Sequence, residues 1–321
     1  MAIFAKADKR FAAYLHVGHR ELINVAIVLL LLYIVVPHLG AFRSSLSVIR
    51  HANGLWVVLA LGFAAATSFV ASFIYLLLAK KRLRYTKTLL VQLASLFINR
   101  LLPAGVGALG LNFEYLRKQK HSQIEAGAVV ATNNLLGLIG NVVLLSALVL
   151  TTSVSLKQLA QPHIGQKIYW FLLAATVLIV IMLVWFRKLR GELFRTVLGA
   201  LKNIRGYRTH PLKVIGALLA SMILTSLYSL SLLACAHAIG LNLAFGQILL
   251  VMTAGVAAGT AVPTPGGLLG VEAGLFAGLV AYKISSADAL AVVLIYRFLT
   301  YWLALVIGLV AWAFVRRRNY I

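Results

Sequence analysis

Two short stretches, Pro103-Ala-Gly-Val-Gly-Ala-Leu-Gly110 and Pro263-Thr-Pro-Gly-Gly-Leu-Leu-Gly270, determine how the rest of the sequence is interpreted. They agree, in the same order and spacing, at a proline, a glycine, a leucine and a second glycine. Each stretch interrupts a long apolar region, and Glu272 follows directly behind the second one. We therefore expect the second stretch to lie at the centre of the protein.

The composition predicts a polytopic helical membrane protein. Of the 321 residues, 62% are hydrophobic, and the chain has 7 acidic residues against 30 basic ones. No soluble domain could cover that much apolar surface. A net charge of +23 would indicate nucleic acid in a soluble protein, but here the basic residues collect in alternate loops, as membrane orientation requires. The lone Cys235 lies in an apolar segment, so neither a disulfide framework nor a cysteine metal site is expected.

Six apolar segments are predicted to span the membrane, and all but the first comfortably exceed the length that a hydrocarbon core of about 30 Å requires. They are residues 22–36, 54–79, 125–150, 168–186, 212–239 and 287–315. The two glycine- and proline-rich stretches interrupt the apolar sequence before the third and the last of these spans. The arms of the first, 87–100 and 105–116, are too short to cross, so we expect a hairpin that enters and leaves on one side. The second has a longer first arm, 245–262, which leaves its re-entrant character open.

The predicted fold is therefore all-α, with six spanning helices and two re-entrant helical hairpins arranged as an inverted repeat. Glu125-Ala-Gly-Ala-Val-Val and Asp288-Ala-Leu-Ala-Val-Val extend the repeat beyond the glycines. Inverted repeats with broken helices are typical of alternating-access transporters, whose substrate site lies where the broken helices meet. The predicted regions are an amphipathic N-terminus 1–20, a first repeat 21–150 with hairpin 87–120, a second repeat 151–315 with hairpin 243–283, and a basic cytoplasmic tail 316–321.

Two acidic residues are predicted to cap helices. Ser122-Gln-Ile-Glu125 and Ser285-Ser-Ala-Asp288 each precede a long apolar helix with the spacing of a capping box. Polar residues at helical spacing also predict faces that point into the bundle, where hydrogen bonding between helices is favoured over a substrate route. These faces are Ser68, Ser72 and Tyr75; Asn134, Gly137 and Asn141; and Ser221, Thr225 and Tyr228.

Glu272 and Arg297 are the predicted centre of the site. Arg297 lies roughly 16 Å into the last span, where a lone charge costs about 3 kcal/mol, so a partner is expected. Three interpretations stay open: a structural ion pair, an anion-binding site centred on Arg297, and proton coupling through Glu272. Arg100 and Glu114 flank the first tip, and we expect them to lie nearer the cytoplasmic face in an interfacial role.

A family resemblance rests on Pro265-Gly-Gly-Leu-Leu-Gly-Val-Glu272 and on Leu294-Ile-Tyr-Arg-Phe-Leu-Thr-Tyr-Trp302. Together they resemble the transmembrane-region family of lysylphosphatidylglycerol synthases, which includes the flippase domain of the multiple peptide resistance factor. The resemblance implies a helical bundle that moves phospholipids or other lipid-linked anions between leaflets. It implies functional roles for Gly266, Gly267, Gly270, Glu272, Tyr296 and Arg297, to which we add Asn134 as a candidate substrate contact. The first stretch departs from the family pattern, because Asn112-Phe-Glu114 stands where a basic residue is usual.

The sequence thus predicts a lipid flippase or transporter in the inner membrane of a bacterium or archaeon, with both termini cytoplasmic. The other hypothesis is a non-transporting scaffold or accessory subunit that binds a lipid- or glycan-modifying enzyme through the basic loop 187–211. The chain ends soon after its last span, so we expect no lysyl-transfer domain and no enzyme activity. No cofactor, metal or nucleic acid is expected, and no nucleotide-binding motif indicates ATP.

Overall fold

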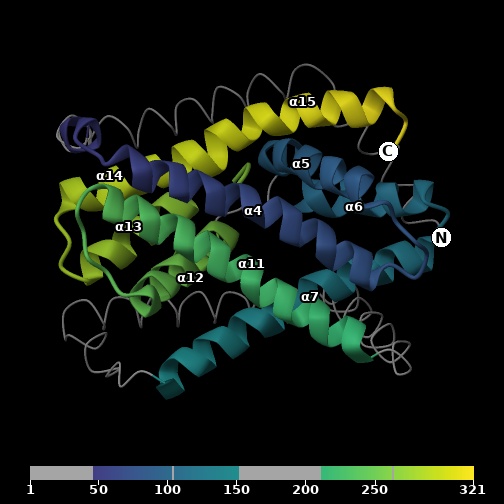
Figure 1. The fold of residues 1–321 in the computed structure, drawn as a ribbon, viewed down its shortest axis with the longest axis horizontal. Helices are drawn as coiled ribbons and strands as arrows, with labels where there is room; N and C mark the ends of the chain where they lie inside the picture. Colours follow the sequence, from purple (N-terminus) through teal and green to yellow (C-terminus); the bar gives the residue numbers. More distant parts are fainter. Residues whose placement is uncertain (1–45, 103–104, 152–210, 262–263) are drawn as a thin grey trace, which may run out of the picture.

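The computed structural model describes residues 46–102, 105–151, 211–261 and 264–321, and the regular elements among them are helices (Figure 1). The predicted spans 22–36 and 168–186, the amphipathic N-terminus and nearly all of the basic loop 187–211 lie outside these residues. The helices are α4 (Gly54–Leu78), α5 (Tyr85–Leu101), α6 (Val106–Lys118), α7 (Gln123–Thr151), α11 (Pro211–Ala238), α12 (Phe245–Ala261), α13 (Gly270–Ala281), α14 (Ser286–Arg297), η2 (Phe298–Leu303) and α15 (Ala304–Arg317).

Four described helices are long and apolar enough to cross a membrane. They are Gly54–Leu78, Gln123–Leu148, Pro211–Ala238 and the 32-residue helix Ser286–Arg317. All four coincide with predicted spans to within a few residues, so these predictions are confirmed. The last of them is one continuous helix in which α14, the π-helical turn η2 and α15 follow one another without a break. The protein is a multi-pass membrane protein.

The helices α4 and α11 pack against each other in opposite directions along their length (Figure 1). Near one end, the backbone N–H of Asn53 donates to Ala238 O at 2.7 Å. Further along, Ser231 Oγ donates to Ala60 O at 2.9 Å. Because a buried hydroxyl must find an acceptor, the second bond fixes the register of the two helices.

The first interrupted segment forms an antiparallel pair of helices, the 17-residue α5 and the 13-residue α6. Gln92 Nε2 donates to Asn112 Oδ1 at 2.6 Å, and the hydroxyls of Thr88 and Tyr115 lie 2.9 Å apart. Both bonds join α5 to α6. The pair closer to the turn on α5 is also the pair closer to the turn on α6, as expected for two antiparallel helices. The predicted second arm, 105–116, is confirmed to within two residues, because α6 runs from Val106 to Lys118.

The second interrupted segment forms an equivalent pair, the 17-residue α12 and the 12-residue α13. Gly255 packs against Leu275, and Gly259 packs against Val271 nearer the turn, so the two helices also run antiparallel. The predicted first arm, 245–262, is confirmed to within one residue. It is no longer than α5, because α5 itself extends beyond the predicted arm 87–100.

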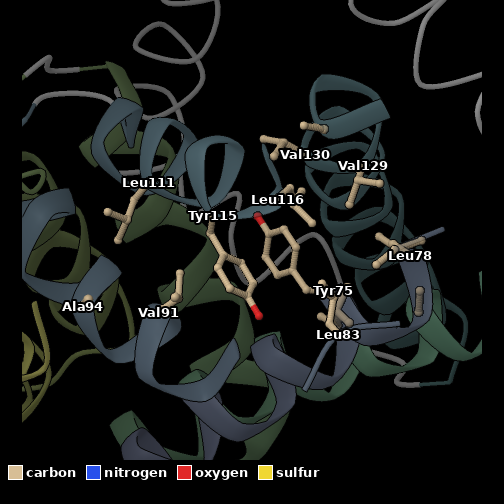
Figure 2. Close-up of a cluster of buried hydrophobic side chains, with 14 of the residues drawn as sticks. Tyr75, Leu78, Leu83, Val91, Ala94, Leu111, Tyr115, Leu116, Val129 and Val130 are labelled. Carbon is tan, nitrogen blue, oxygen red and sulfur yellow. The ribbon is translucent and has the colours of Figure 1, made fainter. Parts of the chain in front are cut away.

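Each hairpin belongs to its own hydrophobic core. One core surrounds α5 and α6, where Tyr75, Val91, Tyr115, Leu116 and Val129 converge from four helices (Figure 2). The other is formed mainly by α11, α12, α13 and α14. In Figure 1 the two hairpins lie at opposite sides of the view, and α4 runs past both.

The turns that follow the two hairpins have the same backbone structure. Lys120 and Lys283 both adopt a positive φ, of 66° and 63°. The next residue, His121 or Ile284, donates its backbone N–H to a carbonyl five residues back. This pattern is the Schellman motif, which closes the C-terminus of a helix.

Both capping predictions are confirmed. Ser122 N donates to Glu125 Oε2 at 3.0 Å while Glu125 N donates to Ser122 Oγ at 3.2 Å, which is a complete capping box. Asp288 N likewise donates to Ser285 Oγ at 3.2 Å. The shorter Asp288 side chain accepts from the Ser285 hydroxyl at 2.7 Å. A reach to the backbone would need the longer side chain of a glutamate.

The polar residues at helical spacing are buried in part as predicted, but their hydrogen bonds differ from the prediction. Ser68, Ser72 and Ser221 are buried, as expected, yet the hydroxyls of Ser72 and Ser221 donate to carbonyls four residues back in their own helices. These two hydroxyls therefore bond within their own helices and do not make the expected hydrogen bonds between helices. A serine in an apolar helix satisfies its donor locally because the carbonyl of the preceding turn is always within reach.

Candidate functional site

Residues 264–269, which lead into α13, form a tight turn. Gly266 and Gly267 have positive φ angles of 62° and 68°, and Leu269 follows with φ 72°. Gly267 N donates to Thr264 O at 3.1 Å, and the Thr264 hydroxyl donates to Leu268 O at 2.5 Å. The glycines supply the left-handed conformations that the turn requires. Consequently α13 begins at Gly270 and places Glu272 in its first turn.

Close packing of the two arms fixes the direction of α13. A Cβ on Gly270 would lie 2.6 Å from Ala258 O, and one on Gly274 would lie 2.7 Å from Ala254 O. Only glycine permits this approach of one helix backbone to the other. The position of Glu272 at the tip is therefore set by the close packing of the α13 backbone against α12.

Glu272 and Arg297 form the predicted ion pair. Arg297 Nε lies 2.6 Å from Glu272 Oε1, and the two side chains are 12% and 27% exposed. Arg297 is the last residue of α14, directly before the π-helical turn. The pair is incomplete, because Arg297 Nη2 and Glu272 Oε2 are buried and have no hydrogen-bond partner among the described residues.

A second arginine reaches the same place from the first hairpin. Arg100, in the last turn of α5, donates from Nε to Tyr301 O at 3.2 Å and from Nη1 to Leu96 O at 2.5 Å. Its Nη2 donates to Thr300 O. Thr300 and Tyr301 belong to η2, and π-helical turns occur frequently at functional sites.

The ring of Tyr301 contacts both guanidinium groups. The Cζ atoms of Arg297 and Arg100 lie 4.8 Å and 5.4 Å from the ring centroid. Such cation–π contacts are stronger where water is excluded. Tyr301 therefore helps to hold two like charges within one small region.

Arg297, Glu272, Arg100 and Tyr301 form one cluster of contacting side chains, and Gly266 brings the second hairpin tip against it. A Cβ at this position would lie 2.6 Å from Tyr301 Cε2 and 3.2 Å from Arg100 Cα. The ends of the two hairpins and the π-helical turn thus meet at one point. The meeting point lies close to the middle of the 32-residue last span.

The cluster carries an excess of positive charge. It contains Arg100 and Arg297 but one carboxylate, Glu272, which is bonded to Arg297. Within the described residues, Arg100 has no carboxylate partner, and its hydrogen bonds go to backbone carbonyls. A buried cation without a counter-ion is costly in an apolar region, and an anion that enters would remove that cost.

A cavity of about 200 Å³ opens beside Arg100. Its walls come from α4, α5, α11, η2 and α15 and are mainly apolar. Thr67, Ser68, Tyr228 and Thr300 add hydroxyl groups to the lining. The cavity can therefore accept an amphipathic group next to the unpaired cation.

The family can now be stated from the whole chain. The model of the transmembrane region of lysylphosphatidylglycerol synthases matches residues 22–308. The chain belongs to this family. The resemblance inferred from the second glycine stretch and the last span is thus confirmed. Among curated proteins, none matches the chain.

The residues carried over from the family occupy different places in the structure. Glu272, Arg297 and Gly266 lie in the cluster. Tyr296 is buried in the second core, where its hydroxyl lies 3.7 Å from Met252 Sδ. Gly267 packs against Val271 and Gly259, in the packing between the arms of the hairpin.

Asn134 lies on α7. Its side chain is exposed and donates to Val130 O at 2.8 Å within its own helix. No contact described for it joins it to Arg297 or Glu272.

The structure corrects the expectation for Arg100. We expected an interfacial role, but Arg100 contacts η2 near the middle of the last span. The signal in the sequence was the position of Arg100 directly before the first tip, inside an apolar segment. Glu114, on the other side of that tip, is exposed.

The departure from the family pattern at Asn112 also has a structural explanation. Asn112 is buried, accepts from Gln92 at 2.6 Å, and donates to Ala108 O at 2.8 Å and toward Ser95 Oγ at 3.3 Å. This network joins α5 to α6. In the first hairpin, therefore, the position is used for packing.

Proposed function

We propose that this protein moves an anionic phospholipid or another lipid-linked anion between the leaflets of the membrane. The observation that supports it best is the unequal charge of the cluster, which holds two arginines, Arg100 and Arg297, and one carboxylate, Glu272, bonded to Arg297. A phosphate group would supply the missing negative charge, and arginine is suited to bind it through two parallel hydrogen bonds. The acyl chains would remain in the bilayer.

We propose further that the two hairpins are re-entrant and that the chain is an inverted repeat with six spans. The matched lengths of the arms, the antiparallel packing of both pairs and the equivalent Schellman turns support this arrangement. Broken helices that meet near the midplane are the usual place for a transporter's substrate. The distribution of basic residues supports cytoplasmic termini in an inner membrane.

In the proposed mechanism, Glu272 is the counter-ion of Arg297 when no substrate is bound. The headgroup anion binds Arg100 and the free side of the Arg297 guanidinium, whose Nη2 has no partner among the described residues. The cavity beside Arg100 accepts the glycerol region of the lipid. Both guanidinium groups already lie at the site, and the Arg100 guanidinium exchanges hydrogen bonds to backbone carbonyls for bonds to the anion.

Translocation in proteoliposomes tests the proposal. Fluorescent phosphatidylglycerol is placed in both leaflets, and its accessibility to a reductant in the outer solution is followed over time. Arg100→Gln and Arg297→Gln should each lower the rate about tenfold or more, because each loses a charge-assisted hydrogen bond to the substrate. Arg317→Gln is the matched control, since Arg317 is exposed at the end of α15.

Thermal unfolding in detergent shows whether each variant is folded. Folded Arg100→Gln and Arg297→Gln proteins with normal translocation would remove both arginines from the mechanism. An equal rate in protein-free liposomes would remove the transport activity itself.

A further inference from the structure

A second feature lies at one end of the bundle, away from the arginine cluster. A groove of about 710 Å³ is formed where α4 ends, α5 begins and α11 starts. α4 and α11 are both candidate membrane spans, so their ends lie where the apolar core gives way to headgroups. Arg84, at the groove, and Arg100, in the cluster, are separated by about 24 Å along α5 at the rise of an α-helix.

The groove is strongly basic. Five cationic side chains line it, and none of the described lining residues is acidic. The five are Lys80, Lys81, Arg82, Arg84 and Lys213. All five are exposed, so they can reach a ligand without a change in the backbone.

Two of these cations already have partners within the protein. Lys80 lies 4.0 Å from Glu125, and Lys81 Nζ donates to Lys120 O. No ion pair or hydrogen bond is found for the side chains of Arg82, Arg84 and Lys213 within the described residues. Three cations therefore remain available to an anion in the groove.

The remaining walls identify the kind of anion. Leu76, at the end of α4, and the buried Ala79 and Leu83 supply the apolar part of the lining, and the exposed Tyr85 also lines the groove. An aromatic residue with a polar tip is typical of the membrane–water interface. A ligand with a phosphate and apolar chains can place the phosphate among the arginines and the chains along α4. It then contacts both the cationic and the apolar residues of the groove.

We propose that this groove binds the headgroup of an anionic phospholipid at the membrane surface. Basic pockets between membrane helices are suited to such headgroups. Arg82 and Arg84 bind the phosphodiester through their planar guanidinium groups, and Lys213 contributes a third charge from α11. The bound lipid joins the α4–α5 loop to the first turn of α11. This site does not depend on the proposed transport function.

Native mass spectrometry of the full-length protein in detergent tests the proposal. The protein is titrated with phosphatidylglycerol and, separately, with phosphatidylcholine of the same acyl chains. Phosphatidylglycerol should bind at least about tenfold more tightly. The combined substitutions Arg82→Gln, Arg84→Gln and Lys213→Gln should weaken its binding about tenfold or more.

The matched control is the combination Arg316→Gln, Arg317→Gln and Arg318→Gln, which removes the same charge from exposed positions at the end of α15. It should change the affinity less than about twofold. An equal loss in both triple variants would overturn the proposal, because it would show attraction to overall charge. Equal binding of phosphatidylcholine, or displacement of the lipid by millimolar glycerol 3-phosphate, would overturn it as well.

Thermal unfolding of each variant separates loss of the site from loss of the fold. If the groove triple variant is unfolded, the single substitution Lys213→Gln gives the same test, because Lys213 is an exposed residue in the first turn of α11. It should weaken phosphatidylglycerol binding about threefold. An unchanged affinity in that variant would contradict the site.

Discussion

At the first hairpin tip, Gly105 takes a left-handed conformation and α6 begins at the next residue. At the second tip, three residues have positive φ angles, and α13 begins at Gly270. The two stretches match in sequence at the glycines Gly107 and Gly267, yet Gly107 lies inside a helix while Gly267 lies in a turn. Matching residues therefore serve close packing at one tip and backbone turning at the other.

The same contrast holds for the polar residues behind the tips. Asn112 and Glu272 occupy corresponding positions, two residues after the last glycine of each stretch. Asn112 bonds to Gln92 and Ser95 in its own hairpin, whereas Glu272 bonds to Arg297 in the last span. The polar residue behind the first tip thus bonds within its own hairpin, whereas the one behind the second tip bonds to the last span, which Arg100 at the end of α5 also contacts.

The largest expected difference between the tips concerns Gly266 and Gly105. Gly266→Ala should lower the free energy of unfolding by about 3 kcal/mol, because the new Cβ meets Tyr301 and the Arg100 backbone in addition to the strained φ. Gly105→Ala should cost about 1 kcal/mol, since φ is its main obstacle and the nearest atom is 3.7 Å away. Thermal unfolding in detergent measures both. Equal shifts would show that Gly266 does not contact the cluster.

Asn112→Leu and Glu272→Gln should separate stability from transport. Asn112→Leu leaves Gln92 without its partner and should cost about 2 kcal/mol of stability, with normal translocation by the protein that remains folded. Glu272→Gln should cost less stability but reduce translocation about tenfold, because Arg297 loses its counter-ion and retains the substrate anion. Both variants are compared by unfolding and by the proteoliposome assay. The reverse result would assign the transport role to the first tip.

Leu269 and Leu109 should respond to glycine in opposite directions. Leu269 has φ 72°, so Leu269→Gly should stabilise the protein by about 1 kcal/mol. Leu109 lies inside α6, so Leu109→Gly should destabilise it by about 1 kcal/mol. A loss of stability in both variants would mean that side-chain packing at Leu269 outweighs the strain in its backbone.

The smallest effect should come from the turns after the hairpins. Buried His121 accepts from Lys81 N at Nε2 and bonds to Leu116 O at Nδ1, and burial lowers its pKa below the ordinary value. A lowered pKa in the folded state gives stability above the unfolded pKa of about 6.5 that is lost as the pH falls. The unfolding midpoint should drop by a few degrees from pH 8 to pH 5.

The corresponding residue of the second turn is Ile284, which supplies the matched variant. His121→Ile should remove this part of the pH dependence. A pH dependence that persists unchanged in His121→Ile would have to come from other groups.

Much of the helical layout could be predicted because length and hydropathy determine which segments can cross a membrane. The pair of Glu272 and Arg297 was also predictable, since an isolated charge at that depth needs a partner. The role of Gly107 was not, because a glycine suits a turn as well as a close approach to the Ile98 carbonyl, and only the packing decides between them. Arg100 was misplaced because its depth depends on where the hairpin ends in three dimensions.

The hydrogen bonds of Arg100 also restrict how the bundle can move. They attach the end of α5 to two carbonyls in the middle of the last span, so these two helices are held together at this point. Any change that separates the first hairpin from the last span must break these bonds before the helices part. A bound anion that draws the Arg100 guanidinium away from these carbonyls would break the bonds. Binding of the substrate would then be coupled directly to separation of the helices.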